Sequence, residues 1–140
     1  MIEYRQFGAE RLEEVCRIYE ENGWKSYLGD PERLSRAFEK SLYLLGAFED
    51  GRLIGFARCV GDAEYILYVQ DLIVSPARQR KGVGRELMRR VSEVFPAVRQ
   101  FVLITDRDDA SSNAFYRAIG LSSSCGGYPI NTYFRTQRGD

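Results

Sequence analysis

The residues best suited to chemistry lie in positions 74–90, V-S-P-A-R-Q-R-K-G-V-G-R-E-L-M-R-R. Six Lys and Arg against one Glu give this stretch a charge of +5, although the whole chain, with 20 basic and 20 acidic residues, is formally neutral. The rest of the chain therefore carries −5. A cationic patch on a strand-to-helix loop indicates a site for an anionic ligand.

The helix predicted after this loop begins at Gly82-Val83-Gly84, with no Ser, Thr, Asp or Asn directly before it. A helix start leaves about four backbone N–H groups without partners, and a phosphate can supply the missing acceptors. The two glycines let the backbone approach such a ligand closely. A Rossmann loop is excluded because Leu87 occupies its third small position, and no Walker A Gly-Lys-Ser/Thr occurs. The residues alone leave two alternatives: a pyrophosphate site or a solvated basic turn.

Composition excludes several other classes of function. The chain has no histidine, which rules out His-based triads and His metal sites, and no metal is expected. Its three cysteines, Cys16, Cys59 and Cys125, are widely spaced, and no signal peptide is apparent, so we expect a cytoplasmic protein. No apolar run reaches the roughly 18 residues of a membrane span. Neutral charge without aromatic residues in the patch argues against nucleic acid.

The predicted elements form a single domain over residues 1–140. Strands are expected at residues 2–7, 42–48, 52–60, 64–74, 101–105 and 128–134. Helices are expected at residues 9–22, 31–40, 82–95 and 110–119, followed by a frayed tail from residue 135.

Local signals fix several of these boundaries. Asp50-Gly51 between two apolar runs predicts a type I′ hairpin. Asp30-Pro31 suits a helix start, and Gly120 suits a helix end. The element order predicts an α+β (mixed α/β) fold whose mostly antiparallel sheet gains one parallel pair through a right-handed crossover over residues 64–105. The short strand at 101–105 is continuously apolar, which predicts cover on both faces.

Three motifs resemble those of the GCN5-related N-acetyltransferase (GNAT) superfamily. Gln79-Arg80-Lys81-Gly82-Val83-Gly84 matches its Q/R-x-x-G-x-G/A loop, and residues 113–121, N-A-F-Y-R-A-I-G-L, resemble its N-x-x-Y helix. The hairpin at residues 44–60 resembles its second and third strands. The resemblance covers nearly the whole chain. It implies a GNAT-like acyl-CoA N-acyltransferase fold, a central mixed, mostly antiparallel sheet flanked by helices, with acetyl-CoA as cofactor.

The resemblance also assigns cofactor residues. The backbone of the loop would bind the pyrophosphate, with the helix beginning at Arg85; the residues are Gln79, Arg80, Lys81, Gly82, Val83, Gly84 and Arg85. Leu72, Ile73 and Val74 would offer main-chain groups to pantetheine, and Asn113 would hydrogen-bond it. A bulge near Asp71 would direct a backbone N–H at the developing oxyanion.

In this family an amine attacks the thioester directly, and Tyr116 matches the residue that protonates the leaving thiolate. A phenol with a pKa near 10 is protonated at neutral pH and can serve as that acid. Without histidine, the base candidates are Asp71 and Glu64 on the strand predicted at 64–74, acting through water. Selection of the neutral amine from bulk is the alternative.

Acceptor binding is expected from Trp24, Tyr27, Arg58 and Tyr68, which suit a small-molecule amine. Two other functions stay open: acetylation of a protein lysine or N-terminus, and a non-catalytic CoA-binding regulatory module. Dimers are common in the family, so a homodimer is also left open. Two departures are the small residues 122–127 before the last predicted strand, and Leu121 where phenylalanine is more usual.

Overall fold

The computed structural model describes residues 1–135, so most of the tail predicted from residue 135 lies outside the described residues. The chain divides into two compact units, Met1–Leu103 and a second that begins at Ile104. A single domain over residues 1–140 stays a prediction.

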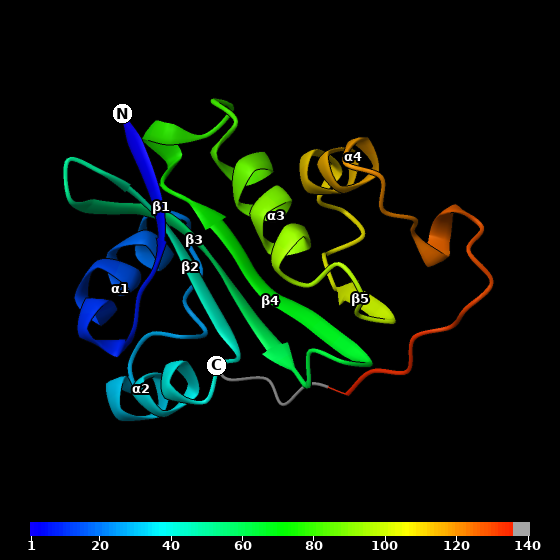
Figure 1. Cartoon of the computed structure of the whole chain (residues 1–140), viewed down its shortest axis with the longest axis horizontal. Helices are drawn as coiled ribbons and strands as arrows, with labels where there is room; N and C mark the ends of the chain where they lie inside the picture. The colour runs from blue at the N-terminus through cyan, green and yellow to red at the C-terminus, as the bar shows by residue number, and fades with distance from the viewer. Residues whose placement is uncertain (136–140) are drawn as a thin grey trace. The chain divides into compact units, whose positions relative to one another are not determined.

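The first unit is built on a five-stranded sheet in the order β1-β2-β3-β4-β5. All neighbours pair antiparallel except β4 and β5, which are parallel. This confirms the mixed, mostly antiparallel sheet and its one parallel pair (Figure 1). The strands are β1 (Ile2–Gln6), β2 (Tyr43–Glu49), β3 (Arg52–Gly61), β4 (Ile66–Val74) and β5 (Gln100–Leu103).

Three helices of this unit cover the sheet: α1 (Leu12–Glu21), α2 (Pro31–Glu39) and α3 (Val83–Val94). α1 and α2 pack on one face and α3 on the other (Figure 1). The core beneath α1 and α2 gathers side chains from both helices and three strands, including Val15, Ile18, Phe38, Phe56 and Ile73. Burial of such side chains is the main stabilising term of the fold.

The predicted boundary signals are confirmed. Asp50 and Gly51 both have positive φ, 51° and 78°, as a type I′ hairpin requires. The side chain of Asp30 caps α2 by accepting a hydrogen bond from the backbone N–H of Arg33 at 3.1 Å.

β4 carries the predicted bulge. Arg58 of β3 lies opposite Asp71, but the next residue, Cys59, lies opposite Val69, so Gln70 is an extra residue in β4. An extra residue reverses the alternation of side chains beyond it. Tyr68 and Asp71, which an unbroken strand would place on opposite faces, therefore share one face.

β5 is shorter than predicted and pairs only with Ile66–Val69. Among residues 1–135, Gln70–Val74 of β4 consequently has no strand neighbour on that side. The prediction that β5 is covered on both faces is wrong, because Val102 is 36% exposed in this edge strand. Because β5 is short, the edge of β4 at Gln70–Val74 is open to a ligand.

The second unit contains α4 (Ala110–Ala118), which Asp109 caps and which ends at Gly120, where φ is 99°. A short 3₁₀ turn follows at Ser124–Gly126. The strand predicted at residues 128–134 is wrong: no strand occurs among the described residues after Leu103. A strand needs a partner edge, and Pro129 lacks the N–H for a ladder bond. Within residues 1–135, none of the helices has the length and apolarity to span a membrane.

Candidate active site

The loop between β4 and α3 presents free backbone donors. Gly82 is the N-cap residue of α3, has φ of 85°, and makes no side-chain cap bond. Arg80, two residues earlier, also has positive φ, 64°. Backbone turned in this way forms a concavity of N–H groups at the positive end of the helix dipole, which suits an anion. This agrees with the uncapped helix start predicted from the sequence.

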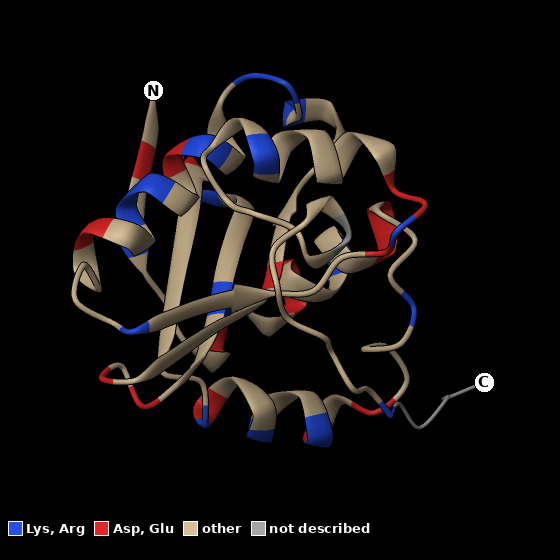
Figure 2. Ribbon diagram, turned by 90° about the vertical axis from the view of Figure 1, so that its right-hand side faces the viewer, with Lys and Arg blue, Asp and Glu red and all other residues tan. Residues whose placement is uncertain are grey.

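The six cations of residues 74–90 fall into two groups. Arg78 is ion-paired with Glu49 at 2.6 Å, Arg89 with Glu86 and Glu93, and Arg90 with Glu86 at 3.5 Å. Arg80, Lys81 and Arg85 are exposed and have no ion-pair partner within residues 1–135. The loop before α3 forms the blue stretch at the top of Figure 2. Three unpaired cations therefore surround the free N–H groups.

The open edge of β4 leads into this loop. Ser75 N–H donates to the Ile54 carbonyl at 2.8 Å, and hydrogen-bonded pairs alternate along an antiparallel ladder. Ile73 therefore directs its backbone groups to β3, while Leu72 and Val74 direct theirs to the open edge. The Val74 carbonyl accepts side-chain amides of Gln79 at 2.9 Å and Asn22 at 3.1 Å. By this register the N–H and C=O of Leu72 and the N–H of Val74 remain on the edge, where a peptide-like ligand can add as a strand.

The second unit holds the two α4 residues predicted to act. The Asn113 side-chain amide donates to the carbonyls of Asp109 at 2.8 Å and Asp106 at 2.9 Å, which leaves its oxygen for a ligand. Burial raises the pKa of Tyr116, and the charge of Asp109 adds to this rise. The Tyr116 hydroxyl is therefore protonated at neutral pH.

A buried ionic cluster lies beside the bulge. Asp71, 1% exposed, accepts hydrogen bonds from Arg58 Nε at 2.7 Å, Tyr19 Oη at 2.8 Å and Tyr27 Oη at 2.6 Å. Burial raises the pKa of both tyrosines, and the Asp71 charge raises it further, so both hydroxyls remain donors. Although burial acts to lower the pKa of Arg58, the Asp71 carboxylate raises it overall. The cluster is thus a fixed ion pair with two neutral phenols.

The match to known families rests on residues 9–121, which fit the model described as "Acetyltransferase (GNAT) family". The chain belongs to this family. Its members transfer acetyl groups from acetyl-CoA, and the loop, the open edge and the unpaired cations found here fit the diphosphate and peptide-like arm of that molecule.

Individual relatives agree with this assignment. An uncharacterized N-acetyltransferase (ycf52-like) of Prochlorococcus marinus is 33% identical over 84 residues, 57% of this chain. The match spans 46% of that relative's length, about half. A GNAT family protein of Streptococcus pneumoniae TIGR4 is 29% identical, with a TM-score of 0.82 over 99% of this chain and 100% of that one.

The fold is also that of the PaiA N-acetyltransferase of Thermoplasma acidophilum, solved in complex with coenzyme A. It is 21% identical, with a TM-score of 0.74 over 86% of this chain and 89% of that one.

Within this GNAT fold, two predicted residues lie where their assigned roles do not fit. Glu64 is not on the central strand: it is exposed in a bend before β4 begins at Ile66. It lies seven positions before Asp71, at most ~23 Å along the chain. Arg58 is 5% exposed and committed to Asp71, so its guanidinium is not free to contact an acceptor.

The remaining acceptor candidates lie near the cluster. Tyr27 stacks on Tyr19 at 4.4 Å between ring centroids, and Trp24, 38% exposed, stacks on the same ring at 6.0 Å. Tyr68 is half-buried on β4, and its pKa is raised by burial and by the charge of Asp71, which agrees with a shared face. The loop between α1 and α2 therefore brings aromatic side chains to the bulge.

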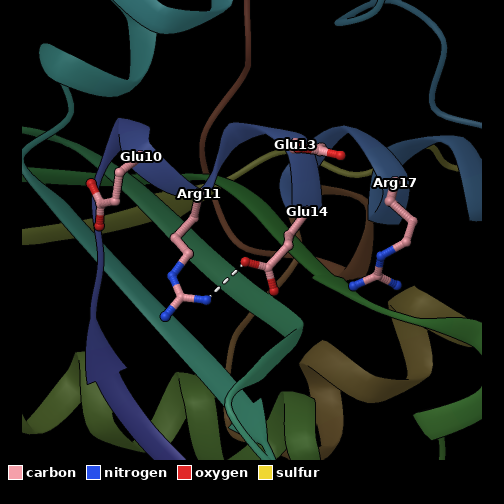
Figure 3. A pocket seen from close by; sticks show the side chains of 5 residues that line it. All are labelled: Glu10, Arg11, Glu13, Glu14 and Arg17. Atoms are coloured by element: carbon pink, nitrogen blue, oxygen red, sulfur yellow. Dashed lines mark hydrogen bonds and ion pairs between the residues drawn. The ribbon is translucent and has the colours of Figure 1, made fainter.

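A separate hollow of about 410 Å³ lies at the start of α1 (Figure 3). Glu14 there bonds Arg11 at 2.8 Å and accepts the backbone N–H of Leu53 at 2.7 Å, while Arg17 donates to the Leu53 carbonyl at 2.6 Å. These side chains fasten α1 to β3. Their polar groups are thus used within the fold rather than offered to a ligand.

Sequence reasoning missed Tyr19 and Gln70 as site residues. Tyr19 fits the apolar stripe of its helix, and nothing in that periodicity distinguishes a core ring from one whose hydroxyl binds a carboxylate. Gln70 becomes notable only because the register makes it the bulge residue. The one available signal was the presence of opposite charges, Arg58 and Asp71, in two adjacent apolar strands.

Proposed function

We propose that this chain transfers the acetyl group of acetyl-CoA to the primary amine of a small molecule. The observation that carries the proposal is the open backbone edge of Gln70–Val74, which continues into the uncapped N-terminus of α3 beside three unpaired cations. A long ligand with a peptide-like arm and a diphosphate fits these groups, the arm along the strand edge and the diphosphate at the helix N-terminus.

Different residues of the chain bind and orient the cofactor. When bound, acetyl-CoA supplies the activated acetyl thioester. The backbone of Gly82–Gly84 and the side chains of Arg80, Lys81 and Arg85 hold the diphosphate, while Leu72 and Val74 orient the arm. We expect a backbone N–H at the bulge to stabilise the negative charge that develops on the carbonyl oxygen.

Tyr116 holds the proton needed by the departing thiolate. Its raised pKa keeps the hydroxyl protonated, and a positioned acid of this kind typically contributes ~10²-fold or more to the rate. Both oxygens of Asp71 already accept hydrogen bonds from donors within the protein. The proton of the amine is therefore released to water, or the neutral amine is taken directly from solution.

The acceptor class follows from the aromatic residues near the bulge. Trp24, Tyr27 and Tyr68 offer rings on which an aryl- or alkylamine can pack. Acetylation of a protein lysine is the second candidate, because Trp24 and the α1–α2 loop are exposed enough to admit a peptide.

An acetyl-transfer screen that reads free thiol tests the function. Its arms are arylalkylamines, polyamines, aminoglycosides and lysine peptides, each with and without acetyl-CoA. We expect turnover with a small amine and a rise in melting temperature with acetyl-CoA. Turnover with lysine peptides alone would show that the acceptor is a protein lysine rather than a small-molecule amine. Binding of acetyl-CoA without turnover in any arm would favour a regulatory module, and the absence of binding would refute the cofactor site.

Replacing Tyr116 with Phe tests the acid. We expect kcat to fall ~100-fold or more with acetyl-CoA affinity unchanged, since the ring remains. Tyr133→Phe, an exposed tyrosine of the same unit, is the control and should leave kcat unaltered. A Tyr116→Phe enzyme with full kcat from pH 6 to 9 would show that the hydroxyl is not the acid.

A further inference from the structure

The cluster around Asp71 joins segments far apart in the sequence. Tyr19 comes from α1, Tyr27 from the α1–α2 loop, Arg58 from β3 and Asp71 from β4. Arg58 also lies over the rings of Tyr27 at 5.6 Å and Phe38 at 5.3 Å. A charged group removed from water in this way is retained only when its partners are fixed. The cluster is therefore a rigid junction.

Tyr27 is the residue through which the α1–α2 loop meets that junction. The loop is bounded by Gly23 and Gly29, both at positive φ, where the backbone turns sharply. Between them, the Tyr27 ring stacks on Tyr19 at 4.4 Å, and its hydroxyl donates to Asp71 Oδ1 at 2.6 Å. Trp24 is carried on the same short loop.

The Tyr27 hydroxyl also contacts the bulge itself. Gln70, the extra residue of β4, donates its side-chain amide to Tyr27 Oη at 2.9 Å. One hydroxyl therefore bonds both Gln70 and Asp71, the two residues that make the bulge. These bonds fix the backbone whose N–H would face the acetyl carbonyl.

We propose that Tyr27 is a positioning residue that locks the α1–α2 loop to the β4 bulge through Gln70 and Asp71, with Arg58 neutralising Asp71. This inference rests on the proposed function, because the bulge and the loop would orient the acetyl group and its acceptor. Asp71 then acts through Tyr27 and takes no proton from the amine.

The main test compares Tyr27→Phe with Tyr43→Phe. The first removes only the hydroxyl that bonds Gln70 and Asp71. The second removes a hydroxyl that has no hydrogen-bond partner within residues 1–135, from a ring packed on Phe95 at 5.3 Å. We expect Tyr27→Phe to lower kcat at least ~10-fold with KM for acetyl-CoA within ~2-fold, which corresponds to ~1.4 kcal/mol of lost transition-state stabilisation. Tyr43→Phe should keep both constants.

Hydrogen exchange of backbone amides provides a readout that does not require turnover. In Tyr27→Phe, exchange should accelerate at residues 23–29 and 70–72, and the rest of the sheet should match the wild type. Unchanged exchange in both segments would overturn the lock, even in an active enzyme. If the wild type acetylates no amine, the proposed function fails, while the exchange result still decides whether the lock exists.

The pH profile of Asp71→Asn separates positioning from proton transfer. If Asp71 only positions other groups, Asp71→Asn should lower kcat/KM at every pH. The fall of kcat/KM toward acidic pH should remain, because a group other than Asp71 titrates there. Disappearance of that fall would make Asp71 the base and overturn its role here. Should Asp71→Asn fail to fold, Gln70→Ala takes its place. That variant is expected to accelerate exchange at residues 23–29, and unchanged exchange there would contradict the lock.

Discussion

The β4–α3 loop and the Asp71 cluster use charge in opposite ways. In the loop and the first turn of α3, Arg80, Lys81 and Arg85 are exposed and unpaired within the described chain, and the helix start has no side-chain cap. In the cluster, Arg58 and Asp71 are buried, and both carboxylate oxygens accept hydrogen bonds. Groups left without protein partners are available to a ligand, whereas fully paired groups hold the protein's own geometry.

The two regions are adjacent in the chain, since β4 carries the cluster at its bulge and ends at the loop. Val74, the last residue of β4, accepts amides from Gln79 of the loop and Asn22 at the end of α1. The hydrogen-bonded bulge is thus followed, at the end of the same strand, by the loop proposed to bind the diphosphate. Substitutions can test whether the loop binds the ligand and the cluster maintains the fold.

The largest effect is expected in the cluster. Asp71→Ala leaves the Arg58 charge buried without its partner, which should lower the free energy of unfolding by about 3–5 kcal/mol. The double variant Arg58→Met/Asp71→Leu removes both charges and should recover much of that loss. Urea denaturation of Arg58→Met, Asp71→Leu and their double variant measures the coupling. Additive losses would mean that the ion pair is not the stabilising feature.

The next largest effect is expected in the loop. Gly82→Asp places a carboxylate at the anion site and should weaken acetyl-CoA binding by ~100-fold, about 2.7 kcal/mol. Gly82→Asn is its neutral match, because asparagine tolerates the positive φ of this residue and an added Cβ meets no atom within 4 Å. The titration should show a much smaller loss for Asn. Equal losses would place the diphosphate elsewhere.

Single cations of the loop and of the first turn of α3 should have smaller effects. Arg80→Gln, Lys81→Gln and Arg85→Gln should each weaken acetyl-CoA binding ~3–10-fold, less at high salt because exposed charges are screened. Arg89→Gln, whose guanidinium is already paired with Glu86 and Glu93, serves as the control and should change affinity less than ~2-fold. Comparable losses at all four positions would indicate a general field effect rather than a site.

The smallest effect concerns a turn outside both regions. Asp62 accepts backbone N–H groups of Glu64, Tyr65 and Ile66 through Oδ1, which lowers its pKa. A carboxylate whose pKa is lower in the folded than in the unfolded state stabilises the fold at pH values above its unfolded-state pKa. This stabilisation is lost as pH falls through the folded-state pKa. Asp62→Asn should therefore lower Tm slightly at pH 7, and the difference should shrink as pH falls below the ordinary Asp value of 3.8. A difference constant with pH would contradict the ionic role.

How much could be predicted from sequence differs between the two regions. The loop depends on neighbours in the chain: glycines, a missing cap and a run of cations are all legible in residues 79–85, and the structure agrees with each. The hairpin and helix boundaries were predictable for the same reason. The absence of a strand at residues 128–134 was not predictable, because a strand-like sequence pattern does not show whether a partner edge is available.

The amino-acid sequence alone determined the family, the element order as far as α4 and the uncapped glycine loop before α3, because these depend on local backbone preferences and short motifs. Only the tertiary structure decided the rest. It showed that Gln70 is a bulge residue, that Glu64 lies before β4, and which cations have acidic partners. It also brought Tyr19 to Asp71 across 52 residues. Such pairings depend on how strands register and helices pack, so residue spacing does not reveal them.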